Sequence, residues 1–194
     1  MWGDCTGVIL CGGKSSRMGF DKTFMTIGSH YLILETYQHL QQLFSTVVLL
    51  SDSTAKFNDK PEFKALTIWE DHYPGTGPLG AITTALEMAE TPYVFIVACD
   101  MPNISIPAIQ QLYDQRGTHQ VILYEQGHRL ETLFAIYHVS CRRVFSRSVN
   151  ENRLRIRDCF QYLSLSTIPL SGENTELSFP NLNTPAEYNL WESR

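Results

Sequence analysis

The stretch Gly7-Val-Ile-Leu-Cys-Gly-Gly-Lys-Ser-Ser-Arg-Met-Gly-Phe-Asp-Lys22 decides the fold of this chain. Its first five residues are small or apolar and carry no charge, which is typical of a buried strand. Gly12 and Gly13 then let the backbone turn sharply and approach a ligand closely, because no Cβ stands in the way. We therefore expect a buried strand that ends in a glycine turn.

Three cations follow the glycine pair, namely Lys14, Arg17 and Lys22. Backbone N–H groups of such a turn bind anions, and the cations add charge-assisted hydrogen bonds to phosphate oxygens. We interpret residues 10–22 as a cradle for a polyphosphate. A Walker loop is excluded because Val8 stands where its first glycine belongs. The alternative left open is an ordinary glycine-rich turn with solvated cations.

Apolar, β-branched runs alternate with segments of helical periodicity along the rest of the chain. The alternation predicts an α/β fold: a single Rossmann-like three-layer domain over residues 1–194, with a mostly parallel, doubly wound sheet and one antiparallel strand. We expect strands at residues 7–11, 47–50, 66–69, 93–98, 120–124 and 165–170, and the antiparallel strand at 133–139. We expect helices through Ile33, Tyr37, Leu40 and Phe44, after Gly77 and Pro78, between Ser105 and Gly117, from Cys141 onward, and after a capping box of Thr184 and Glu187.

Composition excludes several classes of protein. The 194 residues include 15 Lys and Arg against 20 Asp and Glu, a formal net charge of -5, which argues against a partner that is a nucleic acid or an anionic membrane. No apolar run approaches the ~18 residues of a membrane span, and no secretory leader is evident. Five cysteines without any CxxC spacing indicate reduced packing residues. We expect a cytoplasmic protein.

Two acids follow expected strands. Asp100 comes directly after residues 93–98, and Asp71 after residues 66–69. Ligands of doubly wound sheets bind beyond the carboxyl ends of the strands, so Asp100 is a candidate ligand of Mg²⁺, which keeps waters and needs only one or two carboxylates beside nucleotide phosphates. A helix cap or turn is the alternative role of Asp100. Contact with a nucleoside or metal, or plain loop capping, is open for Asp71.

A basic glycine loop and an acid at the same rim indicate transfer of a phosphoryl or nucleotidyl group. In such reactions the enzyme chiefly positions the reactants and neutralises charge. Arg17, Lys22 and Mg²⁺ on Asp100 are the candidates for stabilising the oxygens that gain charge. No covalent nucleophile is required.

At these residues the chain resembles the molybdenum cofactor guanylyltransferases, within the wider glycosyltransferase-A-like nucleotidyltransferases. Residues 10–22 are similar to the LxGGxSxRMGxDK loop of that family. The resemblance continues through Asp71, the Gly-Pro-Leu-Gly segment at 77–80, the Cys-Asp-Met-Pro segment at 99–102 and the Asn-Leu-Asn-Thr-Pro segment at 181–185, in the family's order.

The resemblance implies transfer of GMP from GTP to the terminal phosphate of molybdopterin, with release of pyrophosphate. It also implies roles for individual residues: Leu10, Cys11, Gly12 and Gly13 against the nucleotide, Lys22 on its phosphates, Asp71 on the nucleotide, Asp100 on Mg²⁺, and Asn181 and Asn183 near the pterin. A helix-entry turn is the other reading of these two asparagines. Related enzymes that use CTP tend to carry Ala in place of one glycine, so the pair at 12–13 favours guanine.

The chain departs from the family in two places. Arg129-Leu-Glu-Thr-Leu-Phe134 stands where relatives often show a QPLF-like segment, and Asp52 stands where some carry an Asn that touches the nucleotide. An extra negative charge there would weaken such a contact.

Residues 142–157 contain six arginines. They indicate either a solvated helix face or a docking surface for the pterin phosphate or a molybdoenzyme chaperone. Two other functions stay open: a nucleotidyltransferase for another phosphorylated acceptor using GTP or CTP, and a non-catalytic nucleotide-binding accessory protein.

Overall fold

The computed structural model describes residues 1–12, 21–102, 104–170, 182, 184 and 187–188. In these residues a seven-stranded sheet runs in the order β5-β4-β1-β6-β8-β7-β9, and a small hairpin pairs β2 with β3. The strands are β1 (Trp2–Cys11), β2 (Thr26–Ile27), β3 (His30–Tyr31), β4 (Phe44–Ser51), β5 (Ile68–Glu70), β6 (Tyr93–Ala98), β7 (Val121–Gln126), β8 (Arg129–His138) and β9 (Leu165–Pro169).

The helices alternate with these strands. The α-helices are α1 (Leu32–Gln41), α2 (Pro78–Met88), α3 (Ile106–Asp114), α4 (Arg142–Asn150) and α5 (Ile156–Cys159). The 3₁₀ turns are η1 (Lys22–Phe24), η2 (Ala55–Phe57), η3 (Pro61–Phe63), η4 (Val139–Cys141) and η5 (Phe160–Tyr162).

Strand direction confirms the predicted mixed sheet. Strand β1 pairs in parallel with β4 and β6, and β4 pairs in parallel with β5. Strand β8 is antiparallel to both β6 and β7, and β9 returns parallel to β7. The antiparallel strand arises because β7 and β8 are joined by a tight turn, which leaves no room for a crossover helix.

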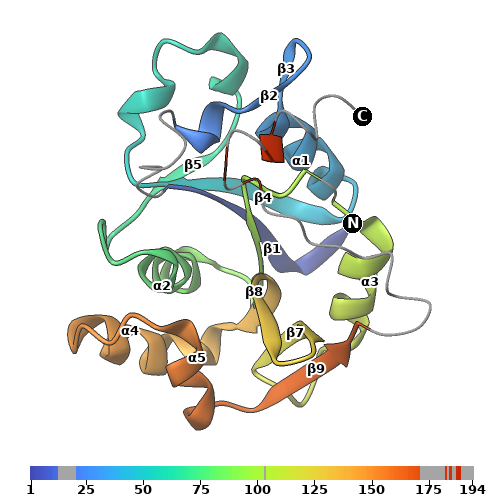
Figure 1. The fold of residues 1–194 in the computed structure, drawn as a ribbon, viewed down its shortest axis with the longest axis vertical. Coiled ribbons are helices and arrows are strands. Elements are labelled where there is room, and N and C mark those ends of the chain that lie inside the picture. The colour runs from blue at the N-terminus through green and yellow to red at the C-terminus, as the bar shows by residue number, and fades with distance from the viewer. Residues whose placement is uncertain (13–20, 103, 171–181, 183, 185–186, 189–194) are drawn as a thin grey trace.

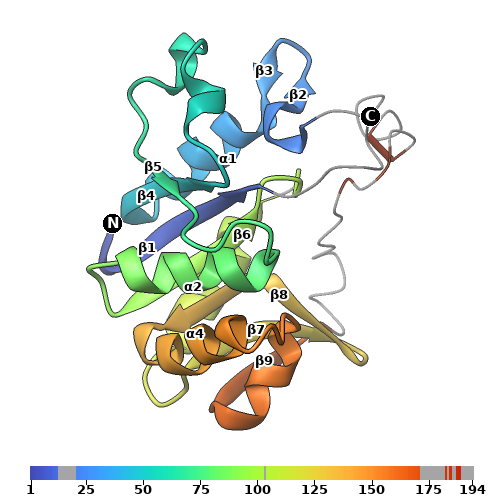
Figure 2. The same ribbon diagram turned by 90° about the vertical axis from the view of Figure 1, so that its left-hand side faces the viewer.

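Helices cover both faces of the sheet, which gives the predicted three layers (Figures 1 and 2). Helices α1 and α3 pack on one face through side chains such as Leu40 and Leu112. Helices α2 and α4 pack on the other through side chains such as Leu86 and Phe145. Alternate β1 residues point to opposite faces, with Ile9 in the first core cluster and Val8 in the second, because successive strand side chains alternate.

Phe44 corrects one sequence expectation. Its spacing from Ile33, Tyr37 and Leu40 suits a helix, but α1 ends at Gln41 and Phe44 begins β4. The Phe44 ring fills the space over Gly7, where an added Cβ would lie 3.0 Å from it. Phe44 therefore faces the same core as Leu40 from the strand, so the hydrophobic spacing continues although the helix does not.

Other boundaries differ in smaller ways. Strand β1 begins at Trp2 rather than at residue 7, β8 begins at Arg129 rather than at 133, and β5 begins at Ile68 rather than at 66. Helix α3 ends at Asp114, three residues before Gly117. The capping box is confirmed: Glu187 N donates to Thr184 Oγ1, and Thr184 N donates to Glu187 Oε2.

Candidate active site

The carboxyl ends of four parallel strands lie at one edge of the sheet, which we call the rim. In sheet order these are β5, β4, β1 and β6. The residues that follow them are Asp71, Asp52, Gly12 and, two residues past β6, Asp100. The order and common direction of these strands therefore place three acids and a glycine along a single edge, which is where doubly wound sheets bind ligands.

Lys22 and Asp100 meet at this rim. Lys22 Nζ donates a hydrogen bond of 2.7 Å to Asp100 Oδ2, and the side chains are 18% and 13% exposed. Lys22 is placed by η1, which Asp21 caps by accepting from Thr23 N at 2.9 Å. Burial acts to raise the pKa of Asp21, but the Thr23 hydrogen bonds and the Lys56 charge outweigh it, so the pKa lies below its ordinary value.

Asp100 does not cap the following helix. Ser105 caps α3 instead, since its side chain accepts from Ala108 N. The carbonyl of Asp100 accepts from Leu182 N at 3.0 Å. Leu182 is buried beside Met25 and Leu32, so a C-terminal residue joins the Lys22 and Asp100 segments.

Four predicted site residues lie outside the described residues: Gly13, Arg17, Asn181 and Asn183. Leu182, which the structure describes, stands between the two asparagines in the sequence.

Leu10 and Cys11 face the protein interior. Their side chains are 7% and 0% exposed and belong to core clusters on opposite faces of the sheet. Their carbonyls are also engaged, because Leu10 O accepts from Cys99 N and Cys11 O accepts from Lys56 Nζ. These two residues therefore shape the strand end, and neither presents its side chain to the rim.

Gly12 packs against the neighbouring strand end. A Cβ added to Gly12 would lie 3.2 Å from the backbone nitrogen of Asp52. Such a distance is tighter than ordinary van der Waals contact, so any larger residue would push the ends of β1 and β4 apart. The structure therefore gives a packing reason for glycine at this position.

Asp71 performs the loop-capping role that sequence analysis left open. Its Oδ1 accepts from Tyr73 N at 2.9 Å and from the Thr84 hydroxyl at 2.8 Å. Thr84 is 0% exposed on α2, and its hydroxyl also accepts from His72 N. These bonds fix the Asp71 carboxylate relative to the α2 helix.

Gly80 lets the loop after Asp71 pack tightly on α2. A Cβ on Gly80 would lie 1.8 Å from Thr76 Oγ1 and 3.0 Å from the Tyr73 carbonyl oxygen. Helix α2 itself starts at Pro78, after Gly77 with φ +69°, a conformation that L side chains rarely adopt. The glycines of segment 77–80 therefore serve a turn and a close contact.

Lys56 is the residue that sequence analysis missed. Its amine lies 3.1 Å from Asp52 Oδ1 and 3.2 Å from Asp21 Oδ2. The negative charge of Asp52, which we expected to weaken a nucleotide contact, is therefore paired with a cation. The only sequence signal was the spacing of four residues between Asp52 and Lys56, a spacing that pairs residues on a helical turn.

The cysteines are free and buried, as expected. Burial raises the pKa of Cys99 and of Cys141 to about 12 each. Thiols with such pKa values hold their protons at neutral pH, so neither has the thiolate that nucleophilic catalysis requires.

The described residues contain no group of three or more His, Cys, Asp or Glu side chains that could hold a metal. Asp100 still supplies the donor that suits Mg²⁺ carried by a triphosphate, because that ion needs only one or two protein carboxylates beside phosphate oxygens and waters. No helix among the described residues is both long and apolar enough to span a bilayer.

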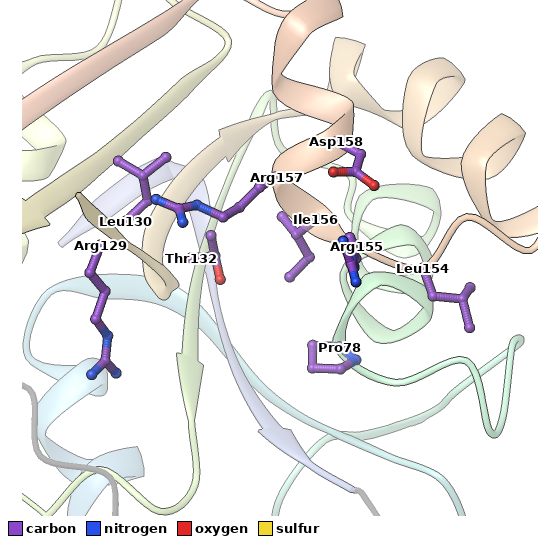
Figure 3. A pocket seen from close by; sticks show the side chains of 9 residues that line it. All are labelled: Pro78, Arg129, Leu130, Thr132, Leu154, Arg155, Ile156, Arg157 and Asp158. Carbon is purple, nitrogen blue, oxygen red and sulfur yellow. The ribbon is translucent and has the colours of Figure 1, made fainter.

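A cavity of about 510 Å³ lies beside β8 and α5 (Figure 3). It lies at the same end of the sheet, because β8 runs antiparallel to β6 and begins near the carboxyl end of β6, while Pro78 opens α2 at the end of the segment that follows β5. Its lining includes three arginines and is made of Pro78, Arg129, Leu130, Thr132, Leu154, Arg155, Ile156, Arg157 and Asp158. The lining thus holds three cations and one acid, Asp158.

Comparisons with known proteins agree on one family. The profile described as MobA-like NTP transferase domain matches residues 7–163. A Clostridium perfringens protein named probable molybdenum cofactor guanylyltransferase is 30% identical over 191 residues, covering 94% of this chain and 93% of its own length. A protein of the same name from Carboxydothermus hydrogenoformans is 29% identical over 188 residues, covering 94% and 92%.

The fold has a close counterpart among solved structures. The crystal structure of molybdopterin-guanine dinucleotide biosynthesis protein A from Archaeoglobus fulgidus superposes with a TM-score of 0.83 and 21% identity, covering 97% of each chain. At this identity the match supports the three-layer architecture, while the assignment to a family rests on the profile and the sequence relatives.

Proposed function

Because this chain belongs to the family of MobA-like NTP transferase domains, we propose that it is a molybdenum cofactor guanylyltransferase. It transfers GMP from GTP to the terminal phosphate of molybdopterin and releases pyrophosphate. The observation that carries the proposal is the hydrogen bond between Lys22 and Asp100, which joins the end of the glycine loop to the acid after β6. A cation and a carboxylate in contact at the ligand rim suit a metal-chelated triphosphate.

The reaction needs positioning and charge neutralisation more than covalent chemistry. An oxygen of the acceptor phosphate attacks the α-phosphorus of GTP, the bond to the β-bridging oxygen breaks, and pyrophosphate leaves with that electron pair. Lys22 donates hydrogen bonds to phosphate oxygens as their charge grows, and Asp100 holds the Lys22 amine in place. Mg²⁺, for which Asp100 is the proposed ligand, supplies Lewis-acid stabilisation of the phosphate oxygens when it is bound.

The rest of the rim supports a bound nucleotide. Gly12 is exposed and carries no side chain, so a nucleotide can approach the backbone at the end of β1. Asp71, held by Tyr73 and Thr84, offers a carboxylate fixed in direction. We propose that these residues contact the nucleotide, together with Gly13 and Arg17 of the loop.

The arginine-lined cavity supports an anionic acceptor. Its volume is within the range of roughly 300–1,000 Å³ that small-molecule sites occupy. Arg155 and Arg157 supply planar donors suited to a phosphate, whereas Arg129 pairs with Glu131 and extends away from them (Figure 3). We propose that the terminal phosphate of molybdopterin reaches the rim from this side, with Asn181 and Asn183 nearby.

The structure divides the arginine-rich segment. Arg155 and Arg157 line the cavity, whereas Arg142 and Arg143 are exposed on α4. Arg147 and Arg153 both pair with Glu151. The pattern favours a role of Arg155 and Arg157 in acceptor binding. It favours a solvated face for α4. Docking of a chaperone and the cytoplasmic location stay predictions.

The decisive experiment measures transfer of label from [α-³²P]GTP to molybdopterin together with pyrophosphate release. We expect a labelled dinucleotide that depends on Mg²⁺ and on molybdopterin. Pyrophosphate release with a sugar or alcohol phosphate but not with molybdopterin would assign a different acceptor. Tight GTP binding without turnover, with Mg²⁺ and molybdopterin present, would assign a non-catalytic role.

Matched arginine variants test the acceptor side. Arg155→Ala is expected to raise KM for molybdopterin about tenfold, the effect of losing a charge-assisted hydrogen bond, without changing KM for GTP. Arg143→Ala removes the same charge from the exposed face of α4 and is expected to change neither constant. Equal effects of the two substitutions would contradict the acceptor assignment.

A further inference from the structure

Lys56 lies at the centre of a charged cluster that includes Asp52 of the rim. Its side chain is 17% exposed. The amine lies within hydrogen-bond distance of four oxygens: Cys11 O at 2.8 Å, Thr23 Oγ1 at 3.0 Å, Asp52 Oδ1 at 3.1 Å and Asp21 Oδ2 at 3.2 Å. An ammonium group has three N–H donors, so these acceptors already saturate it. Lys56 therefore has no N–H group left to donate to a phosphate.

The four oxygens come from three separate segments of the chain. Cys11 ends β1, Asp52 follows β4, and Asp21 and Thr23 belong to the segment that forms η1. One amine thus ties both strand ends to the turn that carries Lys22. Lys22 in turn reaches Asp100, so a continuous set of hydrogen bonds runs from Lys56 through Asp21 and η1 to the acid after β6.

The cluster also sets the charge of this part of the rim. Asp21 and Asp52 bring two negative charges close to the proposed position of a triphosphate. Burial acts to lower the pKa of Lys56, but the two carboxylates outweigh it, so the pKa lies above its ordinary value and the amine stays charged. Without that cation the two carboxylates would repel the polyphosphate.

We propose that Lys56 is a positioning residue for nucleotide binding: it fixes the η1 turn that carries Lys22 and offsets one of the two negative charges of Asp21 and Asp52. The inference rests on the proposed function only in requiring that a nucleoside triphosphate binds at this rim. It does not depend on which acceptor receives the nucleotide.

The test is equilibrium binding of a non-hydrolysable GTP analogue with Mg²⁺, measured by calorimetry without any acceptor. Lys56→Met keeps a chain of similar length and removes the charge. It is expected to raise the analogue's Kd about tenfold or more, and to raise KM for GTP by the same factor while kcat at saturating GTP changes less than about threefold. An unchanged Kd in a folded Lys56→Met protein would overturn the proposal.

Two further variants distinguish loss of the Lys56 charge from nonspecific effects of removing a lysine. Lys64→Met removes an exposed lysine eight residues further along and is expected to leave Kd within about twofold. The double variant Lys56→Met with Asp52→Asn replaces one of the two carboxylates by a neutral amide. It is expected to recover part of the lost affinity for the analogue. A Kd for the double variant that is equal to or higher than that of Lys56→Met would contradict the role of Lys56 in offsetting negative charge.

Folding is checked separately by circular dichroism and thermal denaturation. If Lys56→Met does not fold, Lys56→Gln carries the same test, because its amide still donates hydrogen bonds but no longer carries charge. A weakening of at least threefold is expected, and an unchanged Kd overturns the proposal. Failure of the wild type to use molybdopterin would refute the proposed function without affecting this binding measurement. If the wild type binds CTP rather than GTP, the CTP analogue replaces the probe.

Discussion

Lys22 Nζ lies 2.7 Å from Asp100 Oδ2, although 78 residues separate the two in the sequence. The contact exists because β1 and β6 are neighbours in the sheet and run in parallel, so the segments after both strands leave at the same edge. Each side chain is less than one-fifth exposed but not fully buried, so the pair is largely shielded from solvent and still accessible at the rim. This pair is the centre of the proposed site, and the first prediction follows from it.

Asp100→Asn is expected to remove most of the turnover while leaving the fold intact. We expect kcat/KM to fall at least about 100-fold, as in the loss of a transition-state charge contact, and the free energy of unfolding to fall by about 1–3 kcal/mol, as for a mostly buried charge-assisted hydrogen bond. The measurements are a Mg²⁺ titration of activity and thermal denaturation. Asp114→Asn, an exposed acid at the end of α3, is the control and should behave as wild type. Normal activity of Asp100→Asn at every Mg²⁺ concentration would refute the role of Asp100.

Gly12→Ala tests the close packing between β1 and β4. The new Cβ would lie 3.2 Å from Asp52 N, so we expect a loss of about 1 kcal/mol or more in the free energy of unfolding and a several-fold higher KM for GTP. Gly3→Ala is the matched control, because an added Cβ at Gly3 meets nothing within 4 Å. Denaturant titration and steady-state kinetics measure both effects. Identical behaviour of the two variants would show that the space beside Asp52 is not limiting.

Thr84→Val tests whether Asp71 must be held in place. The substitution keeps the shape of the buried side chain and removes the hydroxyl that donates to Asp71 Oδ1. We expect KM for GTP to rise several-fold with little change in kcat, and the free energy of unfolding to fall by about 1 kcal/mol.

Thr83→Val provides the control for Thr84→Val. Thr83 is equally buried on α2, but its hydroxyl donates to the Leu79 carbonyl of its own helix. We expect it to affect stability without affecting KM for GTP. Equal changes in KM for the two variants would contradict a specific role of Thr84.

Glu131→Gln tests a buried acid on β8. Burial raises the pKa of Glu131 above its ordinary value of 4.5, and Arg129, whose Nε lies 2.9 Å from Oε1, offsets only part of this effect. A raised pKa in the folded state means that this group stabilises the protein fully below about pH 4.5 and loses that contribution as the pH rises through the raised pKa.

The amide of Glu131→Gln does not ionise, so the variant should gain stability relative to wild type as the pH rises from 4 to 8. Melting temperatures measured across this range check the prediction, with the exposed Glu62→Gln as control. Parallel curves for wild type and Glu131→Gln would contradict it.

Local sequence patterns determined the elements of this fold. The β-branched runs of β4 and β6, the proline that opens α2 and the Ser105 cap of α3 each act within a few residues, so their signals are readable without a structure. The boundary at Phe44 was misread because helix and strand happened to place hydrophobic residues on the same face of the core. The alternation of elements also indicated a rim at which Asp71 and Asp100 would gather.

Only the tertiary structure decided which of these groups touch. Lys56 meets Asp21 across 35 residues, and the cavity brings Pro78 of α2 beside Arg155 and Arg129. Such contacts depend on strand order and on the path of each loop, and a pair of distant residues leaves no periodic trace in a single sequence. The sequence by itself therefore determined the layers and the edge that carries the site, while the packing of the sheet decided the partners of each charge.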